Sequence, residues 1–294
     1  MTIDGKTRLA GLLGWPVAHS RSPRLHNYWL QHYGINGAYL PLPVEAAHFA
    51  EAVRGLVRVG FAGANVTVPH KEAAFAICDR VDDSAKKVGA VNTLIFGEAG
   101  EIAGSNTDGF GLIEALRAAV KHFDARRGPA VVLGAGGSAR AVVQALTEAG
   151  APEIRLVNRT PERAERLAAE LGGPVRPTPW SEAATAMEGA ALLVNTTTLG
   201  MKGQPPLALD LAPLPATAVV NDIVYTPLET GLLRAARRRG NPVVDGLGML
   251  LHQARGGFRA WFGRDPEVTE ALRRHIAADL LEEAQRDRAG AEPA

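Results

Sequence analysis

The sequence predicts an α/β protein with two domains, and three observations lead to this prediction. At 294 residues the chain is longer than one average domain. Strand-like and helix-like segments alternate through its first part, which is typical of βαβ units around a mostly parallel sheet. After a polar, turn-like stretch at residues 124–129 the alternation begins again, so we place the crossing between the domains in this region.

The first domain is expected to alternate strands with helices. Apolar runs predict strands at residues 8–13, 37–44, 61–68 and 89–96. Helical patterns cover residues 22–34, 45–60 and, with a break, 69–88. In the helix at 22–34 we expect Ser22 as the N-cap, Pro23 in the first turn and Gly34 at the C-terminal stop.

The second domain is expected to open with a long helix at residues 108–123. Further strands are predicted at residues 129–137, 152–158, 191–197, 218–224 and 242–246, and helices at 138–150, 160–172, 247–263 and 265–287. Residues 289–294 are expected to be disordered.

The last two helices must pack against another part of the chain, and the simplest partner is the first domain. We therefore expect residues 1–108 plus 247–294 to form one domain and residues 109–246 the other. This arrangement would leave a cleft between the two domains.

Composition and charge exclude several classes of protein. Hydrophobic residues make up 46% and charged residues 21%, and the net charge is only +1, so no broad field attracts nucleic acid or a membrane. Cys78 is the only cysteine, which excludes an internal disulfide and a cysteine-rich zinc site. No metal-binding histidine spacing is present, and neither a signal-peptide pattern nor an apolar run of about 20 residues occurs. We expect a cytoplasmic protein without a metal.

The segment NVTVPHK carries the first candidate site. It places Asn65, Thr67 and Lys71 where a predicted strand ends and a helix begins, with Pro69 expected in the first helical turn. Ligands of open α/β sheets bind at the carboxyl ends of strands, which favours a binding site here. The alternative is that these residues serve only as turn and cap residues.

A glycine-rich loop indicates a dinucleotide site in the second domain. Gly134, Gly136 and Ala139 fit the pattern G-x-G-x-x-A directly after an apolar strand and at the start of a helix. In this pattern the glycines permit a tight turn and a close approach of the pyrophosphate, and the helix N-terminus stabilises the phosphates. The alternative is a glycine-rich turn without a ligand.

Arg159 favours NADP over NAD as the dinucleotide. It lies at the end of the next predicted strand, where an NAD enzyme usually carries Asp or Glu. A guanidinium pairs well with a 2′-phosphate. The alternative is a solvated arginine, although a cation at a helix start faces the dipole unfavourably.

The motifs together resemble the NADP-dependent shikimate dehydrogenase family. The resemblance is carried in chain order by GWPVAHSRSP (14–23), NVTVPHK (65–71), GAVNT (89–93), GSNTDGFG (104–111), GAGGSAR (134–140), NRT (158–160), NTTTLGM (195–201), NDIVYTPLET (221–230) and DGLGMLLHQA (245–254). It implies an N-terminal mixed βα substrate domain completed by the C-terminal helices, and a Rossmann-like NADP-binding domain.

The resemblance also implies roles for individual residues. The residues implied to contact the substrate are Ser20, Ser22, Asn65, Thr67, Lys71, Asn92, Asp108, Tyr225 and Gln253. Lys71 and Asp108 would be the catalytic pair, and Ser20 and Ser22 would bind the substrate carboxylate, although either serine could be only a helix cap. The residues implied to hold NADP are Gly134, Ala135, Gly136, Gly137, Ser138, Asn158, Arg159, Thr160, Arg163, Thr196, Ile223 and Gly246. The family commonly has Met at the position of Ile223, and both side chains are apolar and similar in bulk.

The implied reaction is the reversible reduction of 3-dehydroshikimate to shikimate in aromatic amino-acid biosynthesis, with Lys71 as the proton donor. The nearest alternative is a quinate/shikimate dehydrogenase with broader substrate or cofactor use. Two more distant alternatives are a methylene-tetrahydrofolate dehydrogenase and a non-enzymatic, cofactor-binding regulator. The family includes monomers and dimers, so we expect a monomer or a homodimer.

Overall fold

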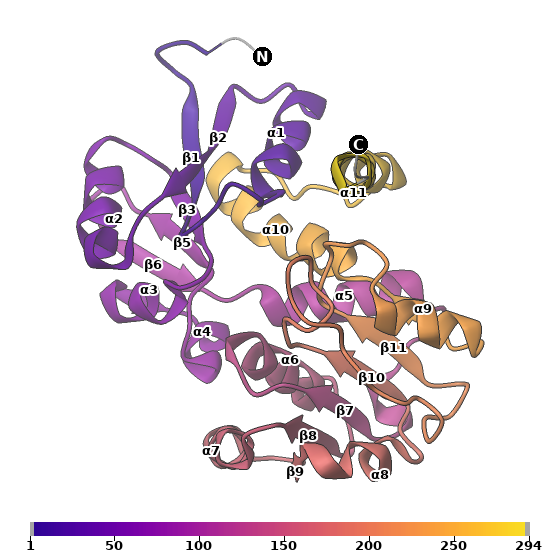
Figure 1. Ribbon diagram of the computed structural model, residues 1–294. Coiled ribbons are helices and arrows are strands. Elements are labelled where there is room, and N and C mark those ends of the chain that lie inside the picture. The colour runs from indigo at the N-terminus through magenta and orange to yellow at the C-terminus, as the bar shows by residue number, and fades with distance from the viewer. Residues whose placement is uncertain (1–2, 292–294) are drawn as a thin grey trace. The chain divides into compact units, whose positions relative to one another are not determined.

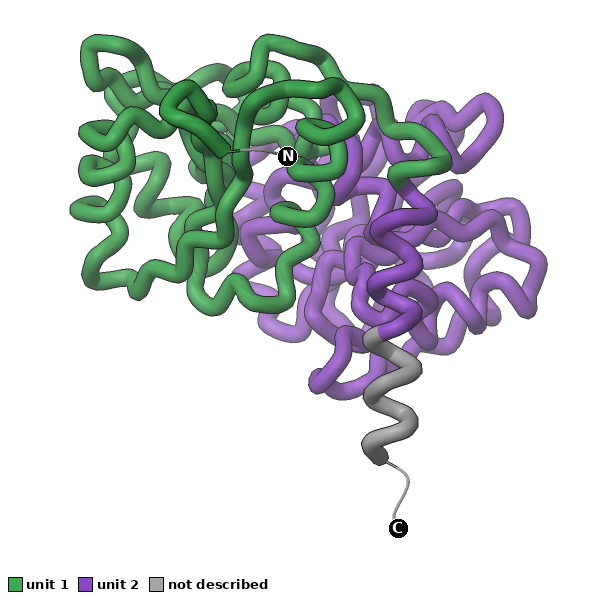
Figure 2. The backbone as a smooth tube through the Cα atoms, turned by 90° about the horizontal axis from the view of Figure 1, so that it is seen from above, with its two compact units in different colours: residues 1–107, 253–272 green, residues 108–252, 273–294 purple. Residues whose placement is uncertain are grey.

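The computed structural model describes residues 3–291 of the chain, and side chains as far as residue 282. The chain forms two compact units (Figure 2): residues 1–107 with 253–272, and residues 108–252 with 273–294. Helix α10 (Gly246–Phe262) contributes its first turns to the second unit and its remaining turns to the first.

The predicted and observed divisions of the chain agree near residue 108 and differ at the C-terminus. Helix α11 (Glu270–Ala291) is grouped mostly with the second unit, whereas we expected it beside the first domain. Arg273, near the start of α11, forms an ion pair with Asp245, which lies at the end of a strand of the second unit. Of the predicted disordered end, residues 289–291 belong to α11, and residues 292–294 lie outside the described part of the chain.

The first unit is built around a mixed sheet with the strand order β2-β1-β3-β5-β6-β4. Its strands are β1 (Arg8–Gly14), β2 (Gly37–Pro43), β3 (Gly63–Val66), β4 (Arg80–Val81), β5 (Thr93–Phe96) and β6 (Ile102–Ser105). Strand β5 runs antiparallel to its neighbours β3 and β6, and the other pairs are parallel. This mixed sheet agrees with the expected mixed βα domain. Strands β4 and β6 were not predicted, because both are short and only partly apolar.

Helices cover both faces of this sheet (Figure 1). They are α1 (Ser22–His32), α2 (Phe49–Arg58), α3 (Lys71–Ile77) and α4 (Asp83–Val88), together with the second part of α10; a short 3-10 turn, Ala46–His48, precedes α2. On one side the apolar faces of α2, α3 and α4 pack on β1, β3 and β5 in a single core. On the other side an aromatic cluster joins α1, β2 and α10, with Trp29, Tyr39, Phe258 and Trp261 at its centre.

The second unit contains a parallel sheet with the strand order β12-β11-β10-β7-β8-β9 (Figure 1). Its strands are β7 (Ala130–Leu133), β8 (Ile154–Asn158), β9 (Val175–Pro179), β10 (Leu192–Asn195), β11 (Val219–Asp222) and β12 (Val243–Val244). The helices are α5 (Asp108–Ala119), α6 (Gly137–Glu148), α7 (Pro161–Leu171), α8 (Ala183–Met187) and α9 (Gly231–Arg238), with 3-10 turns at Ala125–Arg127 and Trp180–Glu182. One core packs α5, α6 and α7 on the sheet, and a second core packs α8 and α9 on its other face.

The region of Pro69 differs from the prediction. The Val68–Pro69 peptide bond is cis, and α3 begins two residues later, at Lys71. Pro69 therefore belongs to a turn before the helix and not to its first turn. The break expected between residues 69 and 88 lies at β4, which separates α3 from α4.

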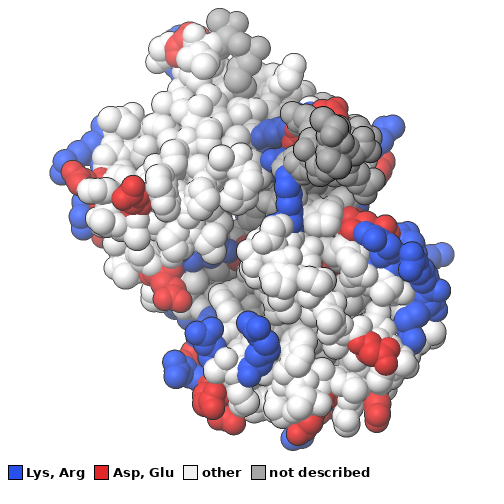
Figure 3. All heavy atoms as spheres, in the orientation of Figure 1, with Lys and Arg blue, Asp and Glu red and all other residues white. Residues whose placement is uncertain are grey.

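Charged groups of both signs are spread over the surface, as the small net charge predicts (Figure 3). The basic residues of α9 form the largest group of one sign in this view, and Arg234 and Arg237 pair there with Glu229 at 3.8 and 3.1 Å. None of the described helices combines the length and apolarity that a membrane crossing requires.

Candidate active site

In the first unit, two predicted site segments leave the sheet side by side. Strands β1 and β3 are parallel neighbours, and the amide of Thr67 donates to the carbonyl of Leu13 at 2.9 Å. The amide of Trp15 in turn donates to the carbonyl of Val68 at 3.1 Å. The loop that carries Ser20 and the turn that carries Thr67 are therefore tied together at the carboxyl ends of these strands.

Ser22 does not cap α1, although we expected it as the N-cap. Helix α1 begins at Ser22, so its N-cap is Arg21, which makes no side-chain cap hydrogen bond. Ser22 is buried, and its amide donates to the Ser20 hydroxyl oxygen at 3.3 Å. The capping explanation for Ser22 is therefore wrong.

Lys71 is the first residue of α3 and is half-buried. Its carbonyl accepts a hydrogen bond from the amide of Val91 at 2.9 Å, so the backbone at Lys71 is fixed to the segment that leads into Asn92. Thr67 is half-buried in the preceding turn, where its carbonyl accepts from the amide of His70 at 3.0 Å. Main-chain hydrogen bonds therefore fix the backbone at Thr67, at Lys71 and in the segment just before Asn92.

Asn65, Asn92 and Gln253 belong to one hydrogen-bond network in the first unit. Asn65 is buried on β3 and donates to the Asn92 carbonyl at 3.1 Å and to the Thr93 hydroxyl at 3.2 Å. The Asn92 amide nitrogen approaches the Thr107 hydroxyl at 3.0 Å and the Gln253 Oε1 at 3.5 Å. Three predicted site residues that lie far apart in the sequence are thereby brought together.

In the second unit, the glycine loop leaves an open space at the start of α6. Gly134 is buried with φ +103°, and a side chain there would meet Thr196 at 2.8 Å. Gly136 and Gly137 are exposed, and a Cβ at either would meet no atom within 4 Å. Ala139 is fully buried, as its small size in the motif requires. The loop together with Ser138 in the first turn of α6 therefore fits a pyrophosphate held by free amides.

Two arginines are exposed to solvent after β8: Arg159 directly follows the strand, and Arg163 lies in the first turn of α7. Asn158 donates to the carbonyl of Thr160 at 2.8 Å, which shapes the turn into α7. Arg159 and Arg163 are both exposed, and within the described part of the chain neither forms an ion pair. These guanidiniums are available to a phosphate, as the sequence predicts.

Thr196, Ile223 and Gly246 converge at the carboxyl edge of the parallel sheet. The Thr196 hydroxyl donates to the carbonyl of Leu133, just before the glycine loop, at 2.6 Å. The amide of Ile223 donates to the Asn195 carbonyl at 3.1 Å. A Cβ on Gly246 would lie 2.2 Å from the Ile223 carbonyl oxygen, so only glycine permits this approach. The residues whose backbone is implied to flank the nicotinamide are thus brought next to the glycine loop.

A buried carboxylate connects the two loops that carry these residues. Asp222 is fully buried at the end of β11 and accepts from the Asn195 amide at 2.9 Å and the Val224 backbone amide at 3.1 Å. Burial raises the pKa of Asp222, and the hydrogen bonds that it accepts oppose this rise. Sequence reasoning missed Asp222, although its place in the NDIVY motif was a signal.

Asp108 and Tyr225 also belong to the second unit. Asp108 is buried as the first residue of α5, where a carboxylate is favoured by the helix dipole. Tyr225 is half-buried in the loop that follows β11. Because Lys71 belongs to the other unit, the pairing of Lys71 with Asp108 stays a prediction.

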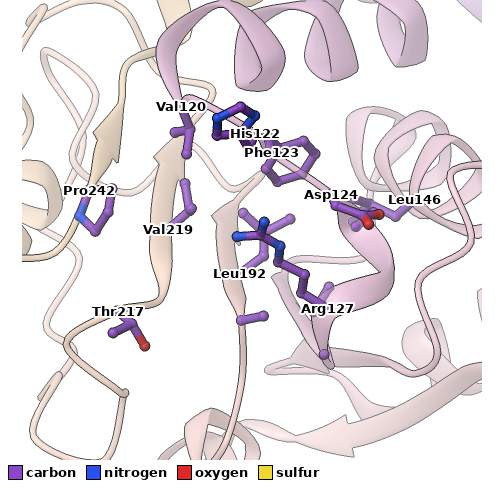
Figure 4. A pocket seen from close by; sticks show the side chains of 14 residues that line it. Val120, His122, Phe123, Asp124, Arg127, Leu146, Leu192, Thr217, Val219 and Pro242 are labelled. Atoms are coloured by element: carbon purple, nitrogen blue, oxygen red, sulfur yellow. The ribbon is translucent and has the colours of Figure 1, made fainter.

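A cavity of about 390 Å³ lies at the opposite edge of the parallel sheet, where strands begin (Figure 4). Val120, Phe123, Leu192 and Val219 supply apolar walls, and Arg127 reaches in among them. None of the predicted site residues lines this cavity. Ligands of such sheets bind at the carboxyl ends of the strands, so we do not assign it to the cofactor.

Comparison with known proteins decides the family. Three family models match the chain: "Shikimate dehydrogenase substrate binding domain" at residues 12–94, "Shikimate / quinate 5-dehydrogenase" at 117–200, and "Shikimate 5'-dehydrogenase C-terminal domain" at 246–274. The chain is 60% identical over 274 residues to the shikimate dehydrogenase (NADP(+)) of Paramagnetospirillum magneticum, covering 93% of this chain and 99% of that protein. The chain belongs to the shikimate dehydrogenase family.

Solved structures of similar proteins share the fold of this chain. The structure from Thermus thermophilus in complex with NADP(H) and shikimate has a TM-score of 0.83 and 38% identity, covering 93% of this chain and 100% of that chain. Quinate dehydrogenase from Corynebacterium glutamicum in complex with NAD has a TM-score of 0.85 and 29% identity, covering 94% and 99%. The family assignment and the two-domain α/β fold class are therefore confirmed.

Proposed function

We propose that this chain is an NADP-dependent shikimate dehydrogenase, which reversibly reduces 3-dehydroshikimate to shikimate in aromatic amino-acid biosynthesis. One observation carries the proposal beyond family membership. This chain is 60% identical to an NADP-dependent relative, and it combines an open glycine loop with two guanidiniums, those of Arg159 and Arg163, that form no ion pair within the described residues. The single cysteine agrees with a reducing compartment such as the cytoplasm, and we expect a monomer or a homodimer.

The cofactor is assigned to the second unit. The amides at Gly136, Gly137 and Ser138 would hold the pyrophosphate, because α6 begins there and its first N–H groups lack helical partners. Arg159 would pair with the 2′-phosphate, supported by Thr160 and Arg163. When bound, NADPH supplies the hydride that reduces the carbonyl carbon. Thr196, Ile223 and Gly246 would shape the surface against which the nicotinamide lies.

The substrate is assigned to residues of the first unit. Ser20 and Ser22 would hold its carboxylate, and Asn65, Thr67, Asn92 and Gln253 would contact or position its hydroxyl groups and ring. No basic residue is required at the carboxylate, since hydroxyl and backbone N–H groups can donate to it. Tyr225 would close on the substrate from the loop after β11.

Lys71 would supply the proton in this reaction. As an ammonium it donates a proton to the C3 oxygen when the carbonyl is reduced, and as an amine it takes the hydroxyl proton in the reverse direction. Asp108, the first residue of α5, would orient Lys71.

A quinate dehydrogenase activity is the second candidate. It is favoured by the family model for "Shikimate / quinate 5-dehydrogenase" and by the likeness to a quinate dehydrogenase in complex with NAD. Arg159 opposes a preference for NAD, because the 2′-hydroxyl of NAD offers no charge to pair with a guanidinium.

Oxidation assays test both candidates. The purified chain is given shikimate or quinate with NADP⁺ or NAD⁺, and the absorbance of the reduced cofactor is followed. We expect shikimate with NADP⁺ to give the highest kcat/KM, whereas a higher value with quinate or NAD⁺ would favour the second candidate. Failure to reduce the cofactor with any combination would refute an enzymatic function of this kind.

The role of Lys71 has its own test. Lys71→Ala should lower kcat by about a hundredfold or more, in the range expected for loss of a general acid–base group. Lys121→Ala, at an exposed lysine of the second unit, is the matched control and should leave kcat unchanged. Near-normal turnover by Lys71→Ala with an unchanged pH profile would refute the assignment.

A further inference from the structure

We propose that the cavity at the edge where the strands of the parallel sheet begin is a second binding site, and that it takes a small carboxylate with an apolar body. The cavity lies wholly within the second unit (Figure 4). Neither the motifs nor the family resemblance pointed to this place. The inference goes beyond the proposed function and does not depend on it, because none of the residues assigned there lines the cavity.

The cavity has the size of a small-molecule site and a floor of packed core residues. Its volume of about 390 Å³ falls within the range of about 300–1,000 Å³ that is usual for such sites. The floor residues are buried, belong to one core, and lie at the starts of three strands and on α6: Ala130, Leu192, Val219 and Leu146. The half-buried side chains of Val120 and Phe123 also line the cavity. An apolar body placed here would exchange water for contact with apolar side chains, which favours binding.

The charge that faces this cavity is the guanidinium of Arg127. Its side chain extends among the apolar residues (Figure 4), and within the described part of the chain it forms neither an ion pair nor a hydrogen bond. The backbone amide of Arg127 donates to the Asp124 carbonyl at 3.3 Å, so Arg127 is held in the short turn beside the cavity. A guanidinium has five N–H donors, and a carboxylate accepts from two of them at once. An anionic head group with carboxylate geometry therefore fits this point.

Asp124 also lines the cavity, but its carboxylate is already paired. Its two oxygens accept from Arg126 Nε at 2.9 Å and from Arg126 Nη2 at 3.0 Å, and Oδ1 also accepts from the Arg126 backbone amide at 3.1 Å. Among the described residues that line the cavity, the other titratable one is His122, which can only add positive charge. The charge left for a ligand is thus that of Arg127. A monoanion suits it better than a dianion, because the carboxylate of Asp124 remains nearby.

The cavity and the proposed cofactor site lie at opposite ends of the same strands. Strands β7, β10 and β11 each begin with a residue that lines the cavity, and they end directly before Gly134, Thr196 and Ile223, respectively. Each of these strands has four residues, so its two ends lie about 10 Å apart. A ligand of the cavity therefore does not occupy the place of the dinucleotide, and both can be bound at once.

NMR titrations with three probes test the two halves of the site separately. Benzoate has a ring and a charge, benzamide has the ring alone, and acetate has the charge alone; sodium chloride keeps the ionic strength equal. Benzoate should shift the methyl resonances of Val120, Leu192 and Val219 saturably, with a Kd of about 1–10 mM, as expected for so few atoms. Benzamide and acetate should each bind at least about fivefold more weakly, because each lacks one of the two interactions. Absence of a saturable shift up to about 50 mM benzoate, or equal binding of benzamide, would overturn the proposal.

The same resonances decide where benzoate binds. Benzoate is a ring carboxylate, like the substrate assigned to the first unit, so binding there must be distinguished. Shifts near Leu13, whose carbonyl accepts from the Thr67 amide, without shifts of Leu192 and Val219 would place benzoate in the first unit and contradict the inference. The shifts of Leu192 and Val219 should persist when NADP⁺ is present in excess. Their loss on addition of NADP⁺ would contradict a site separate from the cofactor.

Variants of Arg127 give the decisive comparison. Arg127→Gln should weaken benzoate binding at least about fivefold, to the level of benzamide, and leave benzamide binding unchanged. Its melting temperature should stay the same, because the side chain has no partner within the described residues. Arg127→Lys keeps the charge without the planar fork and should give an intermediate Kd. Arg238→Gln, at an exposed arginine of α9 without an ion pair in the described part of the chain, is the matched control. Equal benzoate binding by the unaltered chain and Arg127→Gln would refute the site.

Discussion

The hydroxyl of Thr230 donates to the buried carboxylate of Asp222 at a distance of 2.7 Å, and the same hydroxyl oxygen accepts from the amide of Leu233 at 3.3 Å. One side chain thus caps α9 and satisfies a carboxylate that burial would otherwise destabilise. Asp222 in turn binds the Asn195 amide, so the loops after β10 and β11 are joined beneath the predicted nicotinamide surface.

Replacement of Thr230 should therefore affect stability strongly. Thr230→Val keeps the shape but loses the cap and the donor to Asp222, and we expect a loss of about 2–4 kcal/mol in the free energy of unfolding. Thr230→Ser keeps both interactions and should lose less than about 1 kcal/mol. Denaturant unfolding of the two variants gives this comparison, and equal losses would show that the hydroxyl is unimportant.

The two glycines of the cofactor loop should respond differently to alanine. Gly134 has a left-handed backbone and no room for a side chain, so Gly134→Ala should destabilise the fold itself. Gly136 has φ −100° and open space, so Gly136→Ala should leave the melting temperature nearly unchanged. It should nevertheless raise the KM for NADP⁺ by about tenfold or more, because the methyl group would occupy the place of the pyrophosphate. An unchanged KM for NADP⁺ in Gly136→Ala would show that this loop does not contact the cofactor.

Arg159 should decide the choice between the two dinucleotides. Arg159→Ala removes a charge-assisted hydrogen bond to the 2′-phosphate, which should raise the KM for NADP⁺ about tenfold to a hundredfold. The KM for NAD⁺ should hardly change, since NAD lacks this phosphate. Arg166→Ala, at another exposed arginine on α7, is the matched control. Equal effects on both cofactors would place the 2′-phosphate elsewhere.

His26 should make the first unit sensitive to acid. Burial lowers the pKa of His26 to about 3, and the neighbouring Asn65 side chain offsets only part of this. Below about pH 6.5 the unfolded chain therefore binds a proton at His26 that the folded chain does not bind. The free energy of unfolding consequently falls as the pH drops from about 6.5 towards 3. By pH 5 the loss should reach about 2 kcal/mol.

The variant His26→Phe keeps an aromatic ring beside Tyr39 and cannot be protonated. Its free energy of unfolding should therefore decline less between pH 7 and pH 5 than that of the unaltered chain, by about 2 kcal/mol. Unfolding curves of both proteins at pH 7 and pH 5 give the comparison. The quantity to compare is the change in the free energy of unfolding between the two pH values. Parallel pH profiles would show that His26 becomes protonated inside the folded chain.

Local sequence signals were sufficient for the elements that carry the cofactor. The apolar run before Gly134 and the helical pattern after it predicted β7 and α6, and Arg159 was correctly placed at the end of the next strand. These predictions succeeded because glycine turns and buried parallel strands have strong patterns over short stretches of chain.

Local signals failed where a distant contact determines the outcome. Ser22 has the chemistry of an N-cap, yet the helix begins at Ser22 itself. Strand β6 has little apolar character and exists because it pairs with β5 and β4. The role of Asn65 as a ligand stays a prediction, and the structure shows its amide nitrogen donating to Asn92 and Thr93. Its remaining contribution to a ligand is through the oxygen, which Tyr39 already engages.

The sequence by itself determined the family and the two-domain α/β fold class, because motif residues and apolar patterns keep their chemistry wherever the chain places them; the residues for NADP and for proton transfer stay predictions. Only the tertiary structure decided how the polar groups point: Tyr39 to Asn65, Thr93 to Asn92, and Thr230 to Asp222. The reason is physical. A hydrogen bond has a donor and an acceptor, and in a buried network each direction depends on partners that lie far apart in the chain.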